Sequence, residues 1–362
     1  MPLPPNTRSG AIRDAQSLVD AGLISHGDHD EVEKVAARYA VSLTPTVRSL
    51  IDSADPADPI ARQFVPTGAE LSEAPNEDAD PIGDDRFSPV PGIVHRYPDR
   101  VLLKLLHTCP VYCRYCFRRE RVGTTEKPLS DEETAAAIDY VRDRPEIWEV
   151  ILTGGDPFIL SPRRLKDTVR ALEAIDHLGV IRIHTRVPIV DPARINVALI
   201  DAMQTDKAVY VVVHCNHARE LSLPAVKAIR RIIDAGIPVL SQSVLLKGVN
   251  DDAPTLEALF RSLVRARVKP YYLHHPDRAP GTQHFRPSLK RGRTLVDSLR
   301  GNLSGLCQPT YVLDIPGGHG KVPVGIEHAV ETEAGRYRVR DPRGCVHDYL
   351  DELDGGAPFA SD

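Results

Sequence analysis

The chain has 362 residues, of which 42% are apolar and 26% are charged, and its formal net charge is −5 at pH 7. This is enough apolar sequence for one large domain, alone or with an appendage. No run of basic residues indicates a face for nucleic acid, and no apolar run approaches the roughly 20 residues of a membrane span. The N-terminus lacks the charged and apolar regions of a signal peptide. Six cysteines are too few for a disulfide scaffold, so we expect a reducing, cytoplasmic compartment.

The two ends of the chain carry weaker patterns than its middle. In region 1–95, apolar residues at helical spacing predict helices over 14–21 and 31–39. Residues 53–92 are rich in Pro, Asp and Ala, which is typical of an extended connector wrapped on a main domain. We expect this N-terminal region to serve packing and oligomer contacts. Region 326–362 is polar, and we expect an irregular chain with a surface strap from residue 340 and a frayed end.

Between residues 96 and 325, short apolar runs alternate with helical patterns. The predicted strands are 101–106, 149–153, 180–184, 209–214, 238–246, 270–274 and 310–314, and the predicted helices are 134–142, 161–175, 195–204, 223–235, 253–266 and 288–300. This alternation predicts an α/β fold with a parallel sheet and right-handed crossovers. About six repeats fall short of an eight-fold barrel and fit a partial (β/α)6 TIM-like barrel, whose site would form at the C-terminal ends of the strands.

Three cysteines, Cys109, Cys113 and Cys116, are spaced C-x3-C-x2-C. Three thiolates can hold three corners of a [4Fe–4S] cluster and leave one iron without a protein ligand. The spacing resembles the signature of the radical S-adenosyl-L-methionine (radical SAM) superfamily, in which the open iron binds SAM. Tyr115 fits the same pattern, because an aromatic residue before the third cysteine lies near the adenine there. A zinc site with His107 as the fourth ligand and a set of unpaired core cysteines are the alternatives.

Two glycine-containing stretches follow predicted strands. Gly154, Gly155 and Asp156 come directly after the second strand, where glycines allow close approach of a ligand and a carboxylate can accept from an ammonium. A similar motif binds the SAM amino group in radical SAM enzymes, and a plain turn is the alternative. Lys321 ends a loop with three glycines that lacks the spacing of a phosphate-binding P-loop. Such a lysine can form a Schiff base with pyridoxal 5′-phosphate (PLP); the alternative is a solvated loop lysine.

Residues 40–325 resemble the lysine 2,3-aminomutase family of radical SAM enzymes. The resemblance rests on 88–103 (SPVPGIVHRYPDRVLL), the cysteine motif with Arg118, the Gly154 stretch, 214–217 (HCNH), 242–246 (QSVLL), 270–272 (PYY), 284–286 (HFR) and 316–321 (PGGHGK). It implies an isomerase that converts L-lysine to β-lysine with a [4Fe–4S] cluster, SAM and PLP. An electron donor such as flavodoxin or ferredoxin and a homo-oligomeric state are also implied.

The resemblance assigns expected roles to the side chains. Cys109, Cys113 and Cys116 would hold the cluster, and Lys321 would hold PLP. Arg96 would bind the PLP phosphate, which suits a bidentate guanidinium, and Arg118 would pair with the substrate carboxylate. The residues expected around SAM are Tyr115, Gly154, Gly155, Asp156, His214 and Gln242; for His214 and Gln242, core polar groups are the alternative.

Substrate choice follows from the cost of burying a charge. A lysine side chain ends in an ammonium, and burial without a counter-charge is costly. Asp277 and Asp314 match positions that bind this ammonium in the family, although Asp314 could instead cap a turn. Two aspartates therefore favour lysine.

The chain departs from the longer lysine enzymes. Asp252 stands at the position of one zinc-binding cysteine of those enzymes, and the tail contains only Cys345, so we expect no structural zinc. This resembles the short relatives that make (R)-β-lysine for elongation factor P. An aminomutase for another amino acid and a non-catalytic metal-binding module remain as alternatives.

Overall fold

The computed structural model describes residues 10–123 and 127–352. Its centre is a nine-stranded sheet whose strands follow chain order from β1 to β9. The strands are β1 (Ile93–Tyr97), β2 (Arg100–Leu106), β3 (Glu149–Gly154), β4 (Val180–Thr185), β5 (Ala208–His214), β6 (Val239–Val244), β7 (Lys269–His274), β8 (Thr310–Asp314) and β9 (Lys321–Pro323). Strands β2 to β8 are parallel, and β1 and β9 add antiparallel edges. The curled sheet confirms the predicted partial TIM-like barrel.

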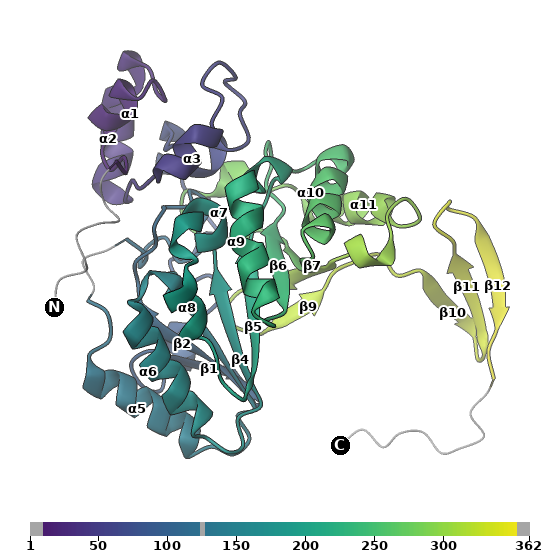
Figure 1. The fold of residues 1–362 in the computed structure, drawn as a ribbon. Helices are drawn as coiled ribbons and strands as arrows, with labels where there is room; N and C mark the ends of the chain where they lie inside the picture. The colour runs from purple at the N-terminus through teal and green to yellow at the C-terminus, as the bar shows by residue number, and fades with distance from the viewer. Residues whose placement is uncertain (1–9, 124–126, 353–362) are drawn as a thin grey trace.

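Helices cover the outer side of this sheet (Figure 1). They are α5 (Asp131–Arg142), α6 (Pro162–Glu173), α7 (Val187–Val190), α8 (Val197–Asp201), α9 (Leu223–Asp234), α10 (Ala253–Arg265) and α11 (Leu289–Leu299). The longer ones begin at a Ser or Asp N-cap, and α5 has the predicted capping box of Ser130 and Glu133. In α9, Ala225, Ala228, Ile229 and Ile232 are buried. This spacing puts one apolar stripe against the sheet.

The N-terminal region forms α1 (Ala15–Asp20), α2 (His29–Arg38), α3 (Pro45–Leu50) and α4 (Ala61–Phe64). Helices α1 and α2 match the two predicted helices. The connector after α4 has only turns and short 3-10 helices up to β1, yet it buries the carboxylates of Glu70 and Asp84. Buried carboxylates need partners, and both find them in residues near the cysteine motif.

The expectation of an irregular chain after residue 324 is wrong. Strands β10 (Ala329–Glu333), β11 (Arg336–Arg340) and β12 (Val346–Leu350) form an antiparallel sheet that stands apart from the barrel (Figure 1). Most of its residues are exposed, so the apolar alternation that marks a half-buried strand is absent. Arg340 pairs with Asp297 of α11 at 2.9 Å. The predicted frayed end at 353–362 lies outside the described residues.

Among the residues that the structure describes, no helix has both the length and the apolar character needed to cross a bilayer.

Candidate active site

The barrel encloses a cavity of about 660 Å³. Several lining residues end parallel strands, including Gly154 of β3, His214 of β5 and Asp314 of β8, as the predicted fold requires. Every predicted site residue lines this cavity: Arg96, Cys109, Cys113, Tyr115, Cys116, Arg118, Gly154, Gly155, Asp156, His214, Gln242, Asp277, Asp314 and Lys321. Residues that are far apart in the sequence, from Arg96 to Lys321, therefore line one cavity.

The three clustered cysteines lie in the loop between β2 and α5. All are free and half-buried. Burial, followed by the negative charges of Asp156 and of the other two cysteines, raises the pKa of Cys109. All three cysteines line the same cavity. Three soft sulfur donors on one wall of a cavity fit three corners of an iron–sulfur cluster. Within the described residues, no three or more His, Cys, Asp or Glu converge on a single metal ion. The three thiolates of such a cluster bind three different irons, so the cysteines need not converge in this way.

A buried ion-pair network anchors the cysteine loop. Glu70 of the connector is only 1% exposed and accepts from Arg114 Nε at 2.9 Å and Arg114 Nη2 at 2.6 Å. Arg119 adds a further contact to the same carboxylate. These two arginines flank Cys116, so the N-terminal connector fixes the loop that carries the cysteines. Removing one partner of a buried pair is strongly destabilising.

Close backbone packing explains the two glycines after β3. A Cβ on Gly155 would lie 2.2 Å from Thr108 O, and Gly154 has a φ of +103°. Both positions therefore require glycine, and the backbone that they approach is the start of the cysteine loop. The Asp156 carboxylate accepts from Thr185 Oγ1 at 2.7 Å and from Arg186 N at 2.7 Å. Asp156 thus joins the ends of β3 and β4, and its expected contact with SAM stays a prediction.

Tyr115, His214 and Asn216 share a hydrogen-bond network near the cysteines. Tyr115 Oη lies 3.1 Å from His214 Nε2 and accepts from Asn216 Nδ2 at 2.7 Å. Burial lowers the pKa of His214, so its imidazole is neutral. His214 and Gln242 are register partners on β5 and β6, which places both expected SAM residues at one edge of the cavity.

Arg186, which sequence reasoning missed, connects this network to the cysteines. Its Nη1 donates to Cys113 Sγ at 2.9 Å, and its Nη2 donates to Glu220 Oε2 at 2.6 Å. Arg186 is 6% exposed and Glu220 1% exposed. The signal available in the sequence was the position of Arg186 directly after β4, where barrel sites form.

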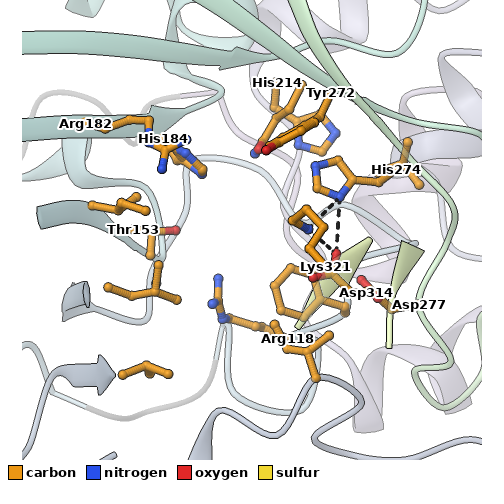
Figure 2. A pocket seen from close by; sticks show the side chains of 18 of the residues that line it. Arg118, Thr153, Arg182, His184, His214, Tyr272, His274, Asp277, Asp314 and Lys321 are labelled. Atoms are coloured by element: carbon orange, nitrogen blue, oxygen red, sulfur yellow. Dashed lines mark hydrogen bonds and ion pairs between the residues drawn. The ribbon is translucent and has the colours of Figure 1, made fainter. Parts of the chain in front are cut away.

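Lys321 and Asp314 are paired by strand register. They are Cα partners of antiparallel β8 and β9, and opposite residues in such a pair have adjacent side chains. Lys321 therefore begins a short strand and does not lie in the loop where we expected it. Lys321 Nζ pairs with Asp314, and His274 Nδ1 lies 3.4 Å from both groups (Figure 2).

The two aspartates of this wall have different acidities. Burial alone would raise the pKa of Asp314, but the hydrogen bond with His274 and the charge of Lys321 outweigh it and hold this pKa below its usual range. For Asp277, burial and then the negative charge of Asp314 raise the pKa to about 7. The pair therefore carries one stable negative charge and a second that titrates near neutral pH.

Arg96 and Arg118 share a counter-ion that sequence reasoning missed. Asp84 of the connector accepts from Arg96 Nη2 at 3.1 Å and from Arg118 Nε at 2.9 Å. Lys104 Nζ lies 3.6 Å from the same carboxylate. Asp84 stands in a segment without periodic pattern, so no signal in the sequence marked it.

Comparison with known proteins identifies the family of this chain. Residues 103–259 match the model of the radical SAM superfamily. L-lysine 2,3-aminomutase of Acetoanaerobium sticklandii is 39% identical over 327 residues, which cover 90% of this chain and 79% of that protein. L-lysine 2,3-aminomutase of Clostridium subterminale is 37% identical, covering 90% and 78%. Glutamate 2,3-aminomutase of Clostridioides difficile is 33% identical, covering 95% and 81%.

These similarities extend over nearly the whole chain and over most of each relative. Membership of the radical SAM superfamily implies a [4Fe–4S] cluster and SAM, and similarity to lysine 2,3-aminomutases implies PLP. The chain therefore belongs to the lysine 2,3-aminomutase family of radical SAM enzymes and is an isomerase of the aminomutase type.

Proposed function

We propose that this aminomutase acts on L-lysine and converts it to β-lysine. The observation that carries the proposal is the pair of aspartates, Asp277 and Asp314, on the cavity wall beside Lys321. The ammonium at the end of a lysine side chain needs a counter-charge when it is buried. Asp314 already pairs with one ammonium, that of Lys321, which is the type of contact that the substrate would make.

A glutamate substrate fits this wall poorly. Its side-chain carboxylate would meet Asp314, whose pKa is depressed and which stays charged. Like charges in a buried cavity repel strongly. Arg118 is a cation of the cavity that suits an α-carboxylate, because guanidinium and carboxylate pair in a bidentate geometry. The arrangement therefore favours an amino acid with a cationic side chain.

The residues of the chain would bind and orient both cofactors. Cys109, Cys113 and Cys116 would hold the cluster, while Lys321 would hold PLP through Nζ and Arg96 would bind its phosphate. When bound, the reduced cluster and SAM supply a carbon radical that abstracts hydrogen, and PLP supplies a conjugated system that stabilises a radical beside the migrating nitrogen.

The protein contributes positioning and exclusion of water. The cavity lies within the barrel but is partly open, so the barrel walls shield reactive groups from solvent only in part. His274 lies within 3.4 Å of both Lys321 Nζ and Asp314. Burial, together with the charge of Lys321, lowers the pKa of His274. The neutral imidazole can accept a proton from Lys321 Nζ when that amine leaves its ion pair with Asp314 to bind PLP.

We further propose a small electron-transfer protein such as flavodoxin or ferredoxin as the reductant, a cytoplasmic location and a homo-oligomer. All six cysteines are free, which suits a reducing compartment. Val346 and Leu350 of β12 point to the same face of the strand and are exposed at 48% and 69%, and exposed apolar residues that gather on one face mark candidate subunit contacts.

Substrate competition tests the proposal. The reconstituted protein is incubated anaerobically with PLP, SAM and reductant in an equimolar mixture of L-lysine, L-glutamate and L-norleucine, and the β-amino acids are quantified by mass spectrometry. We expect β-lysine as the main product, by roughly a hundredfold or more, because an unpaired buried charge costs several kcal/mol. β-Glutamate as the main product would contradict the proposal. Lys321→Ala and Cys113→Ala variants serve as controls and should give no product.

A further inference from the structure

A buried carboxylate lies among three cations at the edge of the cavity. Asp84 is only 4% exposed. Its Oδ1 accepts from Arg96 Nη2 at 3.1 Å, its Oδ2 accepts from Arg118 Nε at 2.9 Å, and Lys104 Nζ lies 3.6 Å from Oδ2. Burial would raise the pKa of Asp84, but the cations, Arg118 first, lower it to about 2. Asp84 is therefore ionised at neutral pH.

The backbone around Asp84 is fixed on both sides. Asp84 N donates to Asp80 Oδ1 at 2.8 Å, and Ser88 Oγ donates to Asp84 O at 2.7 Å. Gly83, with a φ of +67°, packs so closely on the loop before Lys321 that a Cβ there would lie 3.0 Å from the backbone of Gly317. The carboxylate therefore has a defined position relative to both the arginines and the lysine loop.

The atoms that Asp84 uses decide its role. A bidentate carboxylate takes two nitrogens of a guanidinium, either both terminal ones or Nε with one of them, as Glu70 does with Arg114. Asp84 binds the inner Nε, and among the described residues no hydrogen-bond acceptor is found for the terminal nitrogens of Arg118. Arg96 likewise uses only Nη2. Both side chains line the cavity. Arg96 Nε is buried without a partner, so the donors left for ligands are the terminal nitrogens that Asp84 does not use.

Charge balance supports the same conclusion. Three cations surround one carboxylate, and Asp277 is the other carboxylate whose charge acts on both Arg96 and Arg118. Asp84 neutralises only part of the positive charge of the cluster. The excess charge attracts anionic groups, while the shared carboxylate limits the number of rotamers that the two arginines can adopt.

We propose that Asp84 is a positioning residue that orients Arg96 and Arg118 together for two different anions, the phosphate of PLP and the carboxylate of the amino acid substrate. This inference rests on the proposed function, because it takes the two ligands from it. It assigns a second task, beside the anchoring of the cysteine loop by Glu70, to a connector in which no site residue was predicted. It also means that one side chain supports both cofactor binding and substrate selection.

The test compares Asp84→Asn with a matched control one residue away. Asp85→Asn removes the same charge from an exposed carboxylate that pairs with Arg121. The affinity for PLP is measured by absorbance titration without SAM or reductant, so no turnover is needed. Affinities for L-lysine and L-lysinamide, which lacks the carboxylate, are then measured from the change in cofactor absorbance.

We expect Asp84→Asn to weaken PLP binding about tenfold or more, as for the loss of a hydrogen bond to a charged group. The preference for lysine over lysinamide should fall by a similar factor, whereas the control should stay within about twofold of wild type. A loss of preference for the carboxylate is a readout that general destabilisation would not produce. Circular dichroism and iron content show that the variant is folded.

Unchanged or tighter binding of PLP and lysine in Asp84→Asn would overturn the proposal, because a carboxylate that only competed with the anions would give that result. If Asp84→Asn does not fold, Asp84→Glu carries the test, since it keeps the charge and moves it by one methylene. A reduced preference for lysine over lysinamide is then expected, and a wild-type preference would refute the proposal. A wild-type protein that binds no PLP would contradict the proposed function itself.

Discussion

Asp277 offers a sharp test of the substrate assignment because its charge titrates near neutral pH. Burial and the nearby Asp314 raise the pKa of Asp277 to about 7, while Lys321, Arg118 and Arg96 act in the opposite direction. Under the proposed function, the ionised form is the one that would bind the substrate ammonium. Lysine binding should therefore improve as the pH rises through 7 and weaken as it falls.

The size of the effect follows from the titration. With a pKa of about 7, about one tenth of the Asp277 side chains are ionised at pH 6 and about nine tenths at pH 8, so kcat/KM should rise about tenfold over this range. Asp277→Asn removes the charge and should flatten the rise. At pH 8, it should lower kcat/KM by about 10- to 150-fold, the value of a hydrogen bond between charged groups.

The assay measures kcat/KM for L-lysine from pH 6 to pH 8 in wild type and Asp277→Asn. L-Norleucine has the same carbon chain without the terminal ammonium and serves as the ligand control. Its inhibition constant should not vary with pH and should not worsen in the variant. The same pH dependence in Asp277→Asn as in wild type, or for norleucine as for lysine, would refute the reasoning.

Three further substitutions test other parts of the site. Lys321→Ala should abolish retention of PLP after desalting and lower kcat by roughly a thousandfold or more; visible absorbance and turnover check this. Gly155→Ala puts a Cβ 2.2 Å from a backbone oxygen of the cysteine loop. It should cost about 1–3 kcal/mol and lower iron retention, while Gly305→Ala, whose Cβ meets nothing within 4 Å, should do neither. Arg186→Met leaves a buried glutamate unpaired and should cost about 3–5 kcal/mol in urea unfolding of the apoprotein. Arg230→Met, which breaks an exposed pair, should cost about 0.5 kcal/mol or less.

Much of the barrel could be predicted because its strands and helices carry strong periodic patterns. Seven predicted strands correspond to β2 through β8, since buried parallel strands are continuous apolar runs. The residues that line the cavity could also be predicted from the sequence, because a barrel places the C-terminal ends of its parallel strands at one site. Gly154 ends β3, Cys109 lies in the loop after β2, and Lys321 is the register partner of Asp314, which ends β8.

Other features depend on tertiary contacts that leave no local pattern. Strand β1 contains His95 and Arg96 between apolar residues and was missed, although its pairing with β2 extends the sheet. The exposed strands β10 to β12 lack the alternation that sequence reasoning needs. The role of Asp84 could not be predicted, because it depends on ion pairs with Arg96 and Arg118, which are distant in the sequence.

The central claim is that this chain moves an amino group within one lysine molecule by radical chemistry. The most direct measurement uses L-lysine labelled with 15N at the α-amino group, incubated anaerobically with the reconstituted protein, PLP, SAM and reductant. We predict β-lysine that carries the label at C3. Because the rearrangement returns the abstracted hydrogen to the product, 5′-deoxyadenosine should not accumulate in step with β-lysine. Reductive cleavage of SAM without any β-lysine, in protein shown to contain an intact cluster and PLP, would contradict the account.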